Sequence, residues 1–150
     1  MRGGRDRAVD LASYQTAGVG VTVNLATGQG RDTTDGSVGI DTLVNIEGVL
    51  GSLHDDVLIG NSLANVLIGS RGADTVQGGD GDDLIVVADG DGLDTVDGQG
   101  GADVLRVIGT DLVISAPAGR LTVTSGGAVL VEAIGVARLE IVTGDGDDSV

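Results

Sequence analysis

The 150-residue chain contains no cysteine, phenylalanine, tryptophan or lysine, and only one proline and one tyrosine. The lack of cysteine excludes disulfides, thiolate metal sites and cysteine nucleophiles. The near absence of aromatic residues excludes the aromatic-centred core of an ordinary globular domain. The sequence has no apolar run of about 18 residues, so it contains no candidate transmembrane helix. No apolar segment follows the charged N-terminus, so a classical signal peptide is also not expected.

Basic residues are scarce as well. The chain has 8 arginines against 20 Asp and 3 Glu, which gives a formal net charge of -15. Such a field repels phosphate, so neither nucleic acid nor an anionic membrane is an expected partner. The excess of Asp over Glu indicates turns and metal ligation, because aspartate favours turns. A general role of the acidic residues in solubility is the alternative interpretation.

Glycine and aliphatic residues are abundant, and they follow a nine-residue period between residues 51 and 106. The clearest copy is GGDGDDLIV, residues 78–86. The units start at Gly51, Gly60, Gly69, Gly78, Asp89 and Gly98. Their sixth positions are Asp56, Asn65, Asp74, Asp83, Asp94 and Asp103, and their eighth positions are Leu58, Leu67, Val76, Ile85, Val96 and Leu105. A fixed period of this kind sets the fold, because each unit must stack on its neighbours to bury its apolar side chain.

The order of residue types within a unit predicts a metal site. Glycines at the first, second and fourth positions allow a sharp turn with φ > 0 that points carbonyl oxygens inward. A carboxylate two residues after the fourth position then lies beside those carbonyls. Oxygen-only ligands are typical of Ca²⁺ rather than of Mg²⁺ or a transition metal. The candidate calcium-binding residues are the six sixth-position residues and the turn glycines Gly72, Gly79, Gly81, Gly92 and Gly101.

The pattern G-G-x-G-x-D-x-U-x, where U is aliphatic, resembles the RTX or haemolysin-type calcium-binding repeat of secreted bacterial proteins. The resemblance covers residues 51–106, with loose partial copies at 36–44 and 143–150. It implies an all-β fold, a right-handed parallel β-roll (a β-solenoid) with two units per coil and short β segments on either side. It also implies that Ca²⁺ is held between turns stacked on the same side of the roll. The implied pairs are Asp56 with Asp74, Asn65 with Asp83, Asp74 with Asp94, and Asp83 with Asp103.

Three features depart from the family pattern. The fourth position is His54 in the first unit and Leu63 in the second, so we expect those two turns to bind poorly or not at all. Val87 and Ala88 interrupt the nine-residue count, and we expect them to bulge or loop out. The sites built from residues 69–83 fit the pattern best.

We expect four segments along the chain. Residues 1–50 form a lead-in that caps the open end of the roll, with a strand from Val19 to Leu25, a loop at 26–35 and Tyr14 closing the end of the core. Residues 51–106 form the array, and residues 107–142 form short strands without metal-binding turns. Residues 143–150 restart the repeat, which indicates a piece of a longer repeat protein. The outward positions of strands 57–59 and 66–68 are apolar, so we expect the lead-in or a partner to cover that face.

These features favour a non-catalytic calcium-binding module of a secreted, extracellular bacterial protein that folds where calcium is plentiful. The resemblance implies type I secretion, with a signal beyond this sequence. One alternative is a calcium-rigidified adhesion or matrix spacer. Another is a β-helix enzyme acting on acidic polysaccharide, which the short strands and the lack of a lysine base disfavour. The expected partner is Ca²⁺; a cell-surface or polysaccharide partner would be bound by other parts of a parent chain.

Overall fold

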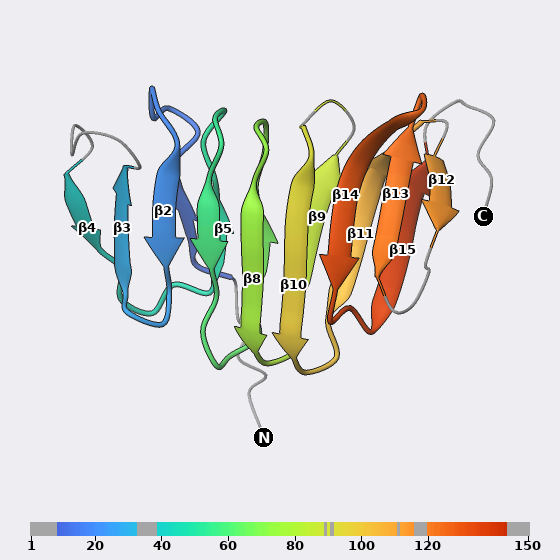
Figure 1. The fold of residues 1–150 in the computed structure, drawn as a ribbon. Coiled ribbons are helices and arrows are strands. Elements are labelled where there is room, and N and C mark those ends of the chain that lie inside the picture. Colours follow the sequence, from blue (N-terminus) through green and yellow to red (C-terminus); the bar gives the residue numbers. More distant parts are fainter. Residues whose placement is uncertain are drawn as a thin grey trace, which may run out of the picture.

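The structure is a computed structural model, and it describes residues 9–32, 39–88, 90, 92–110, 112–115 and 120–143. Every regular element in these ranges is a β-strand, so the prediction of an all-β chain is confirmed. The strands form two layers that face each other across a narrow interior (Figure 1). No helix in the described part of the chain has the length and hydropathy that a membrane span requires.

One layer is a six-stranded sheet in which all neighbours are parallel. Its order is β1 (Leu11–Ser13), β5 (Gly48–Leu50), β7 (Val66–Ile68), β9 (Leu84–Ala88), β11 (Val104–Gly109) and β15 (Arg138–Thr143).

The other layer is a nine-stranded mixed sheet, parallel in its middle and antiparallel at both ends. Its order is β12 (Leu112–Ser115), β13 (Leu121–Ser125), β14 (Ala128–Ile134), β10 (Asp94–Gly100), β8 (Thr75–Asp80), β6 (Val57–Ile59), β2 (Val21–Asn24), β3 (Gln29–Asp32) and β4 (Ile40–Thr42).

From β5 to β11 successive strands alternate between the two sheets, and each pairs with the strand two places further along the chain. The register aligns the eighth positions, for example Leu58 with Val76 and Ile85 with Leu105. All six eighth-position side chains are at most 2% exposed. Each nine-residue unit therefore contributes its eighth-position aliphatic side chain to a narrow core. Aliphatic side chains fill a core of this width, so aromatic residues are not needed.

The two extra residues after the fourth unit do not bulge, so that expectation was wrong. Val87 and Ala88 lengthen β9, where they pair with Val107 and Ile108 of β11, and Val87 is buried. The next strand of the same sheet carries the same two-residue extension, so both keep their ladder hydrogen bonds and a bulge is unnecessary.

The lead-in differs in part from the expectation. β2 follows the predicted strand, and Tyr14 is buried at the end of the core. Residues 29–32, expected as loop, form β3. In the described part of the loose repeat, residues 39–44, β4 pairs antiparallel with β3, and Asp41, at the sixth position, is exposed, unlike the buried sixth positions of the array. These strands extend the edges of the two sheets, so they do not cover the outward apolar residues of β6 and β7.

The described residues after the array form short strands, as expected for residues 107–142. β14 and β15 also continue the parallel stacking beyond residue 106, pairing with β10 and β11. The amide of Arg138 donates to the carbonyl of Asp103 at 2.9 Å, just as the amide of Val104 donates to that of Asp83 at 2.8 Å. The parallel stack thus continues beyond the glycine turns of the repeat. The partial repeat at 143–150 lies outside the described residues beyond Thr143.

Candidate calcium site

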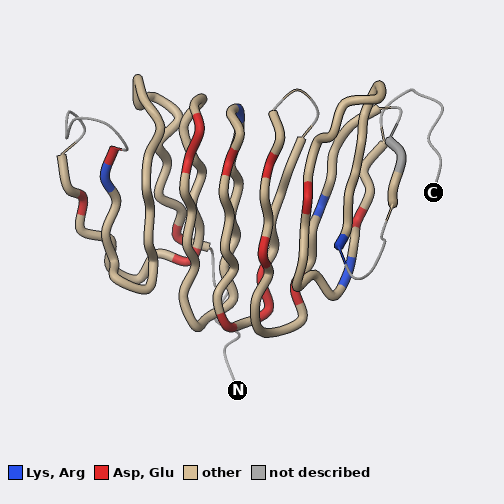
Figure 2. The backbone as a smooth tube through the Cα atoms, in the orientation of Figure 1, with Lys and Arg blue, Asp and Glu red and all other residues tan. Residues whose placement is uncertain are grey.

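The six sixth-position side chains line the two ends of the strands. Asp56, Asp74 and Asp94 lie at the starts of β6, β8 and β10 in the nine-stranded sheet, and we call them the upper ladder; Figure 2 shows acidic residues along this end of the strands. Asn65, Asp83 and Asp103 lie along the opposite end and form the lower ladder. All six are at most 2% exposed, although five of them carry a carboxylate. Burying an ionisable group is unfavourable unless polar partners compensate, so the partners of these side chains decide their role.

Neighbours within each ladder are joined by one repeated hydrogen bond. The backbone N–H of each sixth-position residue donates to Oδ1 of the sixth-position carboxylate two units further on. The N···O distances are 2.8 Å from Asp56 to Asp74, 2.8 Å from Asn65 to Asp83, 2.9 Å from Asp74 to Asp94 and 3.0 Å from Asp83 to Asp103. The structure therefore brings together all four of the residue pairs expected from the sequence. Whether these pairs bind calcium stays a prediction.

The turns fall into two conformations. From the third unit onward, the fourth-position glycines are all left-handed, with φ of 120° at Gly72, 115° at Gly81, 130° at Gly92 and 124° at Gly101. Second-position residues there are left-handed too, for example Gly79 with φ of 103°. In the first two units, neither the second nor the fourth position has positive φ among the described residues. His54 and Leu63 thus mark turns of another shape, because side chains avoid the left-handed region.

The protein itself satisfies the first carboxylate of the upper ladder. Oδ1 of Asp56 accepts from the Ser52 hydroxyl at 2.7 Å and from the Val21 amide at 2.7 Å, and Oδ2 accepts from the Ser52 amide at 2.6 Å. Ser52 was not among the candidate site residues. Ser52 is the second residue of a unit whose fourth position lacks glycine. This departure from the repeat pattern is the sequence signal that points to Ser52. Asp56 therefore has its hydrogen bonds without any cation.

The first residue of the lower ladder is satisfied in the same manner. Oδ1 of Asn65 accepts from the Asn61 amide at 2.7 Å, and Nδ2 donates to the Glu47 carbonyl at 3.2 Å. The group of the preceding coil that Asn65 contacts is the carbonyl of Glu47, whereas the group that Asp83 contacts is the backbone amide of Asn65. A carboxylate would be repelled by the Glu47 carbonyl, which explains the amide at this one position of the ladder.

The later carboxylates of the lower ladder are not satisfied. Oδ2 of Asp83 and Oδ2 of Asp103 are buried, and neither has a hydrogen-bond partner among the described residues. The pKa of Asp83 is raised to about 6, mainly by burial; the Asn65 amide opposes the shift, and the nearby Asp103 and Asp82 add to it. Burial also raises the pKa of Asp103 and that of Asp56. The folded chain thus holds carboxylate oxygens that lack a counter-charge.

The space beside these oxygens suits a cation that takes oxygen ligands. A Cβ on Gly78 would lie 2.5 Å from Oδ2 of Asp83 and 2.6 Å from the carbonyl oxygen of Gly98. A Cβ on Gly98 would likewise lie close to Oδ2 of Asp103 and to the carbonyl oxygen of Gly135. In the described part of the chain no three His, Cys, Asp or Glu side chains converge, so a bound ion needs backbone carbonyls as well. Carboxylate plus carbonyl oxygen is the donor set that Ca²⁺ accepts.

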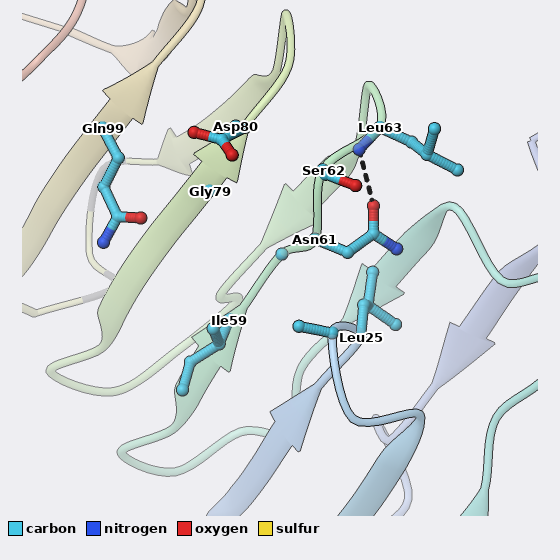
Figure 3. Close-up of a pocket in the computed structure, with 10 residues that line it drawn as sticks. Leu25, Ile59, Asn61, Ser62, Leu63, Gly79, Asp80 and Gln99 are labelled. Atoms are coloured by element: carbon cyan, nitrogen blue, oxygen red, sulfur yellow. Dashed lines mark hydrogen bonds between the residues drawn. The ribbon is translucent and has the colours of Figure 1, made fainter.

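Outside the ladders, acidic residues serve as turn acceptors. Oδ1 of Asp55 accepts from the Ala73 amide and Oδ1 of Asp82 from the Ala102 amide, both at 2.8 Å. A hollow of about 540 Å³ lies beside the second-unit turn, where Leu63 donates its amide to Oδ1 of Asn61 (Figure 3). Among the described residues that line it, Asp80 carries the one carboxylate.

Stacked glycine turns with buried carboxylates and oxygen-only donors are typical of a calcium-binding repeat protein. Comparison with protein families agrees: residues 50–85, 59–93 and 86–106 match the family model of the RTX calcium-binding nonapeptide repeat, in 4 copies. The chain carries RTX-type calcium-binding repeats, and the cofactor of such repeats is Ca²⁺. A comparison with curated proteins found no match.

Proposed function

We propose that this chain is a non-catalytic module of a secreted bacterial protein, which winds into a right-handed parallel β-roll when it binds calcium outside the cell. The observation that carries the proposal is the pair of buried, unpartnered carboxylate oxygens on Asp83 and Asp103. The right-handed sense is supported by the parallel pairing of alternate strands, because parallel crossovers are right-handed in about 98% of cases.

Electrostatics couples calcium binding to folding. Neighbouring strands lie about 4.8 Å apart, so two bare carboxylates in adjacent coils repel by about 3 kcal/mol at an effective dielectric of about 20. Asp83 and Asp103 are such a pair. They would hold the ion together with turn carbonyls such as that of Gly98. A bound Ca²⁺ turns this repulsion into attraction, and the binding free energy becomes folding free energy.

This coupling suits export of an unfolded chain. Extracellular calcium modules have dissociation constants of about 10⁻⁴ to 10⁻³ M. At such affinities the coils that hold Asp83 and Asp103 stay unfolded in a calcium-poor cytosol and fold after type I secretion. The described residues also favour a non-catalytic role. Ser52, His54 and Asp56 share one turn, but Ser52 is fully buried and its hydroxyl donates to Asp56, so it is not an accessible nucleophile.

The test is a far-UV circular dichroism titration with CaCl₂, with MgCl₂ at equal ionic strength as the control. We expect a cooperative coil-to-β transition with Ca²⁺ alone. The Asp83→Ala variant should need at least about tenfold more calcium, because it lacks one buried ligand. The Asp80→Ala variant removes the same charge from an exposed position of the same unit and should titrate like the parent.

A chain that has its full β signal in chelator, and does not respond to calcium, would contradict the proposal. So would equal effects of the two substitutions, since the response would then depend on net charge rather than on the buried site.

A further inference from the structure

The last coil of the stack is closed by a residue outside the repeat. The family match ends at residue 106, whereas the parallel stack continues into β14 and β15, beside β10 and β11 (Figure 1). Gly135 lies between β14 and β15, and its carbonyl oxygen comes close to Gly98, the first residue of the last repeat unit. In the coil before, the carbonyl of Gly98 comes close to Gly78 in the same way. Gly135 thus occupies the place of a repeat glycine, although no repeat unit surrounds it.

The carbonyl of Gly135 lies beside the unsatisfied oxygen of Asp103. Asp103 is fully buried, its Oδ1 accepts from the Asp83 amide at 3.0 Å, and its Oδ2 has no hydrogen-bond partner among the described residues. A Cβ on Gly98 would lie 2.5 Å from this Oδ2 and closer still to the Gly135 carbonyl oxygen, so the two oxygens are no more than about 5 Å apart. Ca–O distances are about 2.3–2.6 Å, so one ion can contact both oxygens.

Gly135 is held against the array by contacts that leave no room for a side chain. Its φ is 67°, and a Cβ there would lie 3.0 Å from Oδ1 of Asp97. The amides of Ala137 and Arg138, which follow it, donate to the backbone carbonyl of Asp103 at 3.0 Å and 2.9 Å. The protein therefore holds the Gly135 carbonyl in place without an ion.

The charge around Asp103 favours a cation. Burial raises the pKa of Asp103, and the nearby carboxylates of Asp82 and Asp97 add to the shift. The two arginines that line the same hollow as Asp82 do not neutralise this charge, because both form ion pairs with Glu140. A buried carboxylate oxygen, a fixed carbonyl and excess negative charge are together suited to a cation that takes oxygen ligands.

We propose that Oδ2 of Asp103 and the carbonyl of Gly135 hold a Ca²⁺ ion that fastens β14 and β15 to the end of the array. This site rests on the proposed function, since it requires that the repeats bind calcium. It adds a ligand from a part of the chain that the repeat pattern does not cover, and it extends calcium-dependent order beyond residue 106.

The last site should bind calcium more weakly than the site between Asp83 and Asp103. Ala137 lies level with Asp103 in the last coil, so the ladder supplies one carboxylate here instead of two. The affinity of a calcium site depends on the number of its charged ligands. We therefore expect β14 and β15 to become ordered at a higher calcium concentration than the array.

Hydrogen exchange of the whole chain over a CaCl₂ titration tests the proposal through peptides from residues 128–143. In the parent chain calcium should raise their protection at least about tenfold. Asp103→Asn removes the ligand charge but keeps an Oδ1 acceptor, so it should abolish most of this gain. Asp83→Asn changes the preceding site and should keep the gain. Asp97→Asn is the charge control: it removes a nearby half-buried carboxylate that is not a proposed ligand and should respond like the parent.

Failure of this site and failure of the proposed function give different results. A calcium-dependent gain in residues 84–109 without one in residues 128–143 overturns the site and leaves the proposed function intact. No gain in either range contradicts both.

The variants give three further ways to overturn the site. A gain in residues 128–143 that survives Asp103→Asn shows that Asp103 is not a ligand there. An equal loss in Asp83→Asn shows that β14 and β15 only follow the array, and an equal loss in Asp97→Asn shows that net charge decides. Circular dichroism in calcium checks that the variants fold; if Asp103→Asn does not, Asp103→Glu, which keeps the charge but displaces the oxygens by one methylene, replaces it and should lose the gain likewise.

Discussion

At the residue scale, one ladder position can hold either a carboxylate or an amide, and the neighbouring coil decides between them. Asn65 donates to the Glu47 carbonyl and is satisfied without metal. Asp83, one coil further on, accepts the Asn65 amide with Oδ1 and leaves Oδ2 without a partner. The chain thus contains its own comparison between a ladder residue that the protein satisfies and one that keeps an unsatisfied buried oxygen.

This comparison predicts that Asp83→Asn has opposite effects on the stability of the chain without calcium and with calcium. Without calcium the substitution removes a buried negative charge and supplies a donor beside the Gly98 carbonyl, so the free energy of unfolding should rise by about 1 kcal/mol. With calcium it removes a ligand, so the stabilisation produced by the ion should fall. The far-UV circular dichroism signal in chelator and urea unfolding in CaCl₂ measure the two effects, with the exposed Asp80→Asn as the control. A loss of the same size in both conditions would show that Asp83 is purely structural.

At the element scale, the repeat works because glycine turns stack on each other at backbone distance. Gly101 has a φ of 124°, and a Cβ there would collide with the Gly81 carbonyl. In the first coil, His54 and Leu63 occupy the fourth position, and the turns avoid the left-handed region. The stack tolerates both shapes because the sixth-position hydrogen bonds continue through each of them.

Gly101→Ala should therefore destabilise the array. Holding a non-glycine residue in a left-handed turn costs about 1–3 kcal/mol, and the carbonyl contact adds to that cost. Gly18→Ala is the control, because a Cβ at Gly18 meets no atom within 4 Å and should change stability by less than about 0.5 kcal/mol. Urea unfolding in saturating calcium measures both variants. An equal, small effect of the two substitutions would argue against close stacking of the turns.

At the scale of the whole molecule, the stack divides into a coil whose ladder side chains are satisfied by the protein and coils whose ladder carboxylates keep a buried oxygen without a hydrogen-bond partner among the described residues. Asp56 and Asn65 are satisfied by the protein, whereas Asp83 and Asp103 are not. In a stack where each coil contacts only its neighbours, stability is local, so parts can open separately.

Hydrogen exchange with and without chelator should show this division. Amides in β2 and β5–β7 should keep most of their protection when calcium is removed, because protein donors hold that coil together. Amides in β8–β11 should lose protection by at least about tenfold, which corresponds to about 1.4 kcal/mol of local stability. Mass spectrometry of peptides from residues 48–68 and 84–109 measures the two regions. A uniform loss across both would indicate a single cooperative unit instead.

The sequence by itself determined the all-β class and the repeat register, and its resemblance to the RTX repeat supplied the residues that meet across neighbouring coils. It could do so because a strict nine-residue period places every sixth and eighth position in one structural environment. Only the tertiary structure decided which of these residues are satisfied, since that depends on groups far along the chain, such as Val21 for Asp56 and Glu47 for Asn65. The tertiary structure also decided the conformation of Val87 and Ala88. The nine-residue period predicts an interruption there, but the two residues pair with Val107 and Ile108 and form strand. The local sequence pattern therefore determines the conformation of each unit, and contacts between coils determine which of its side chains are satisfied by hydrogen bonds.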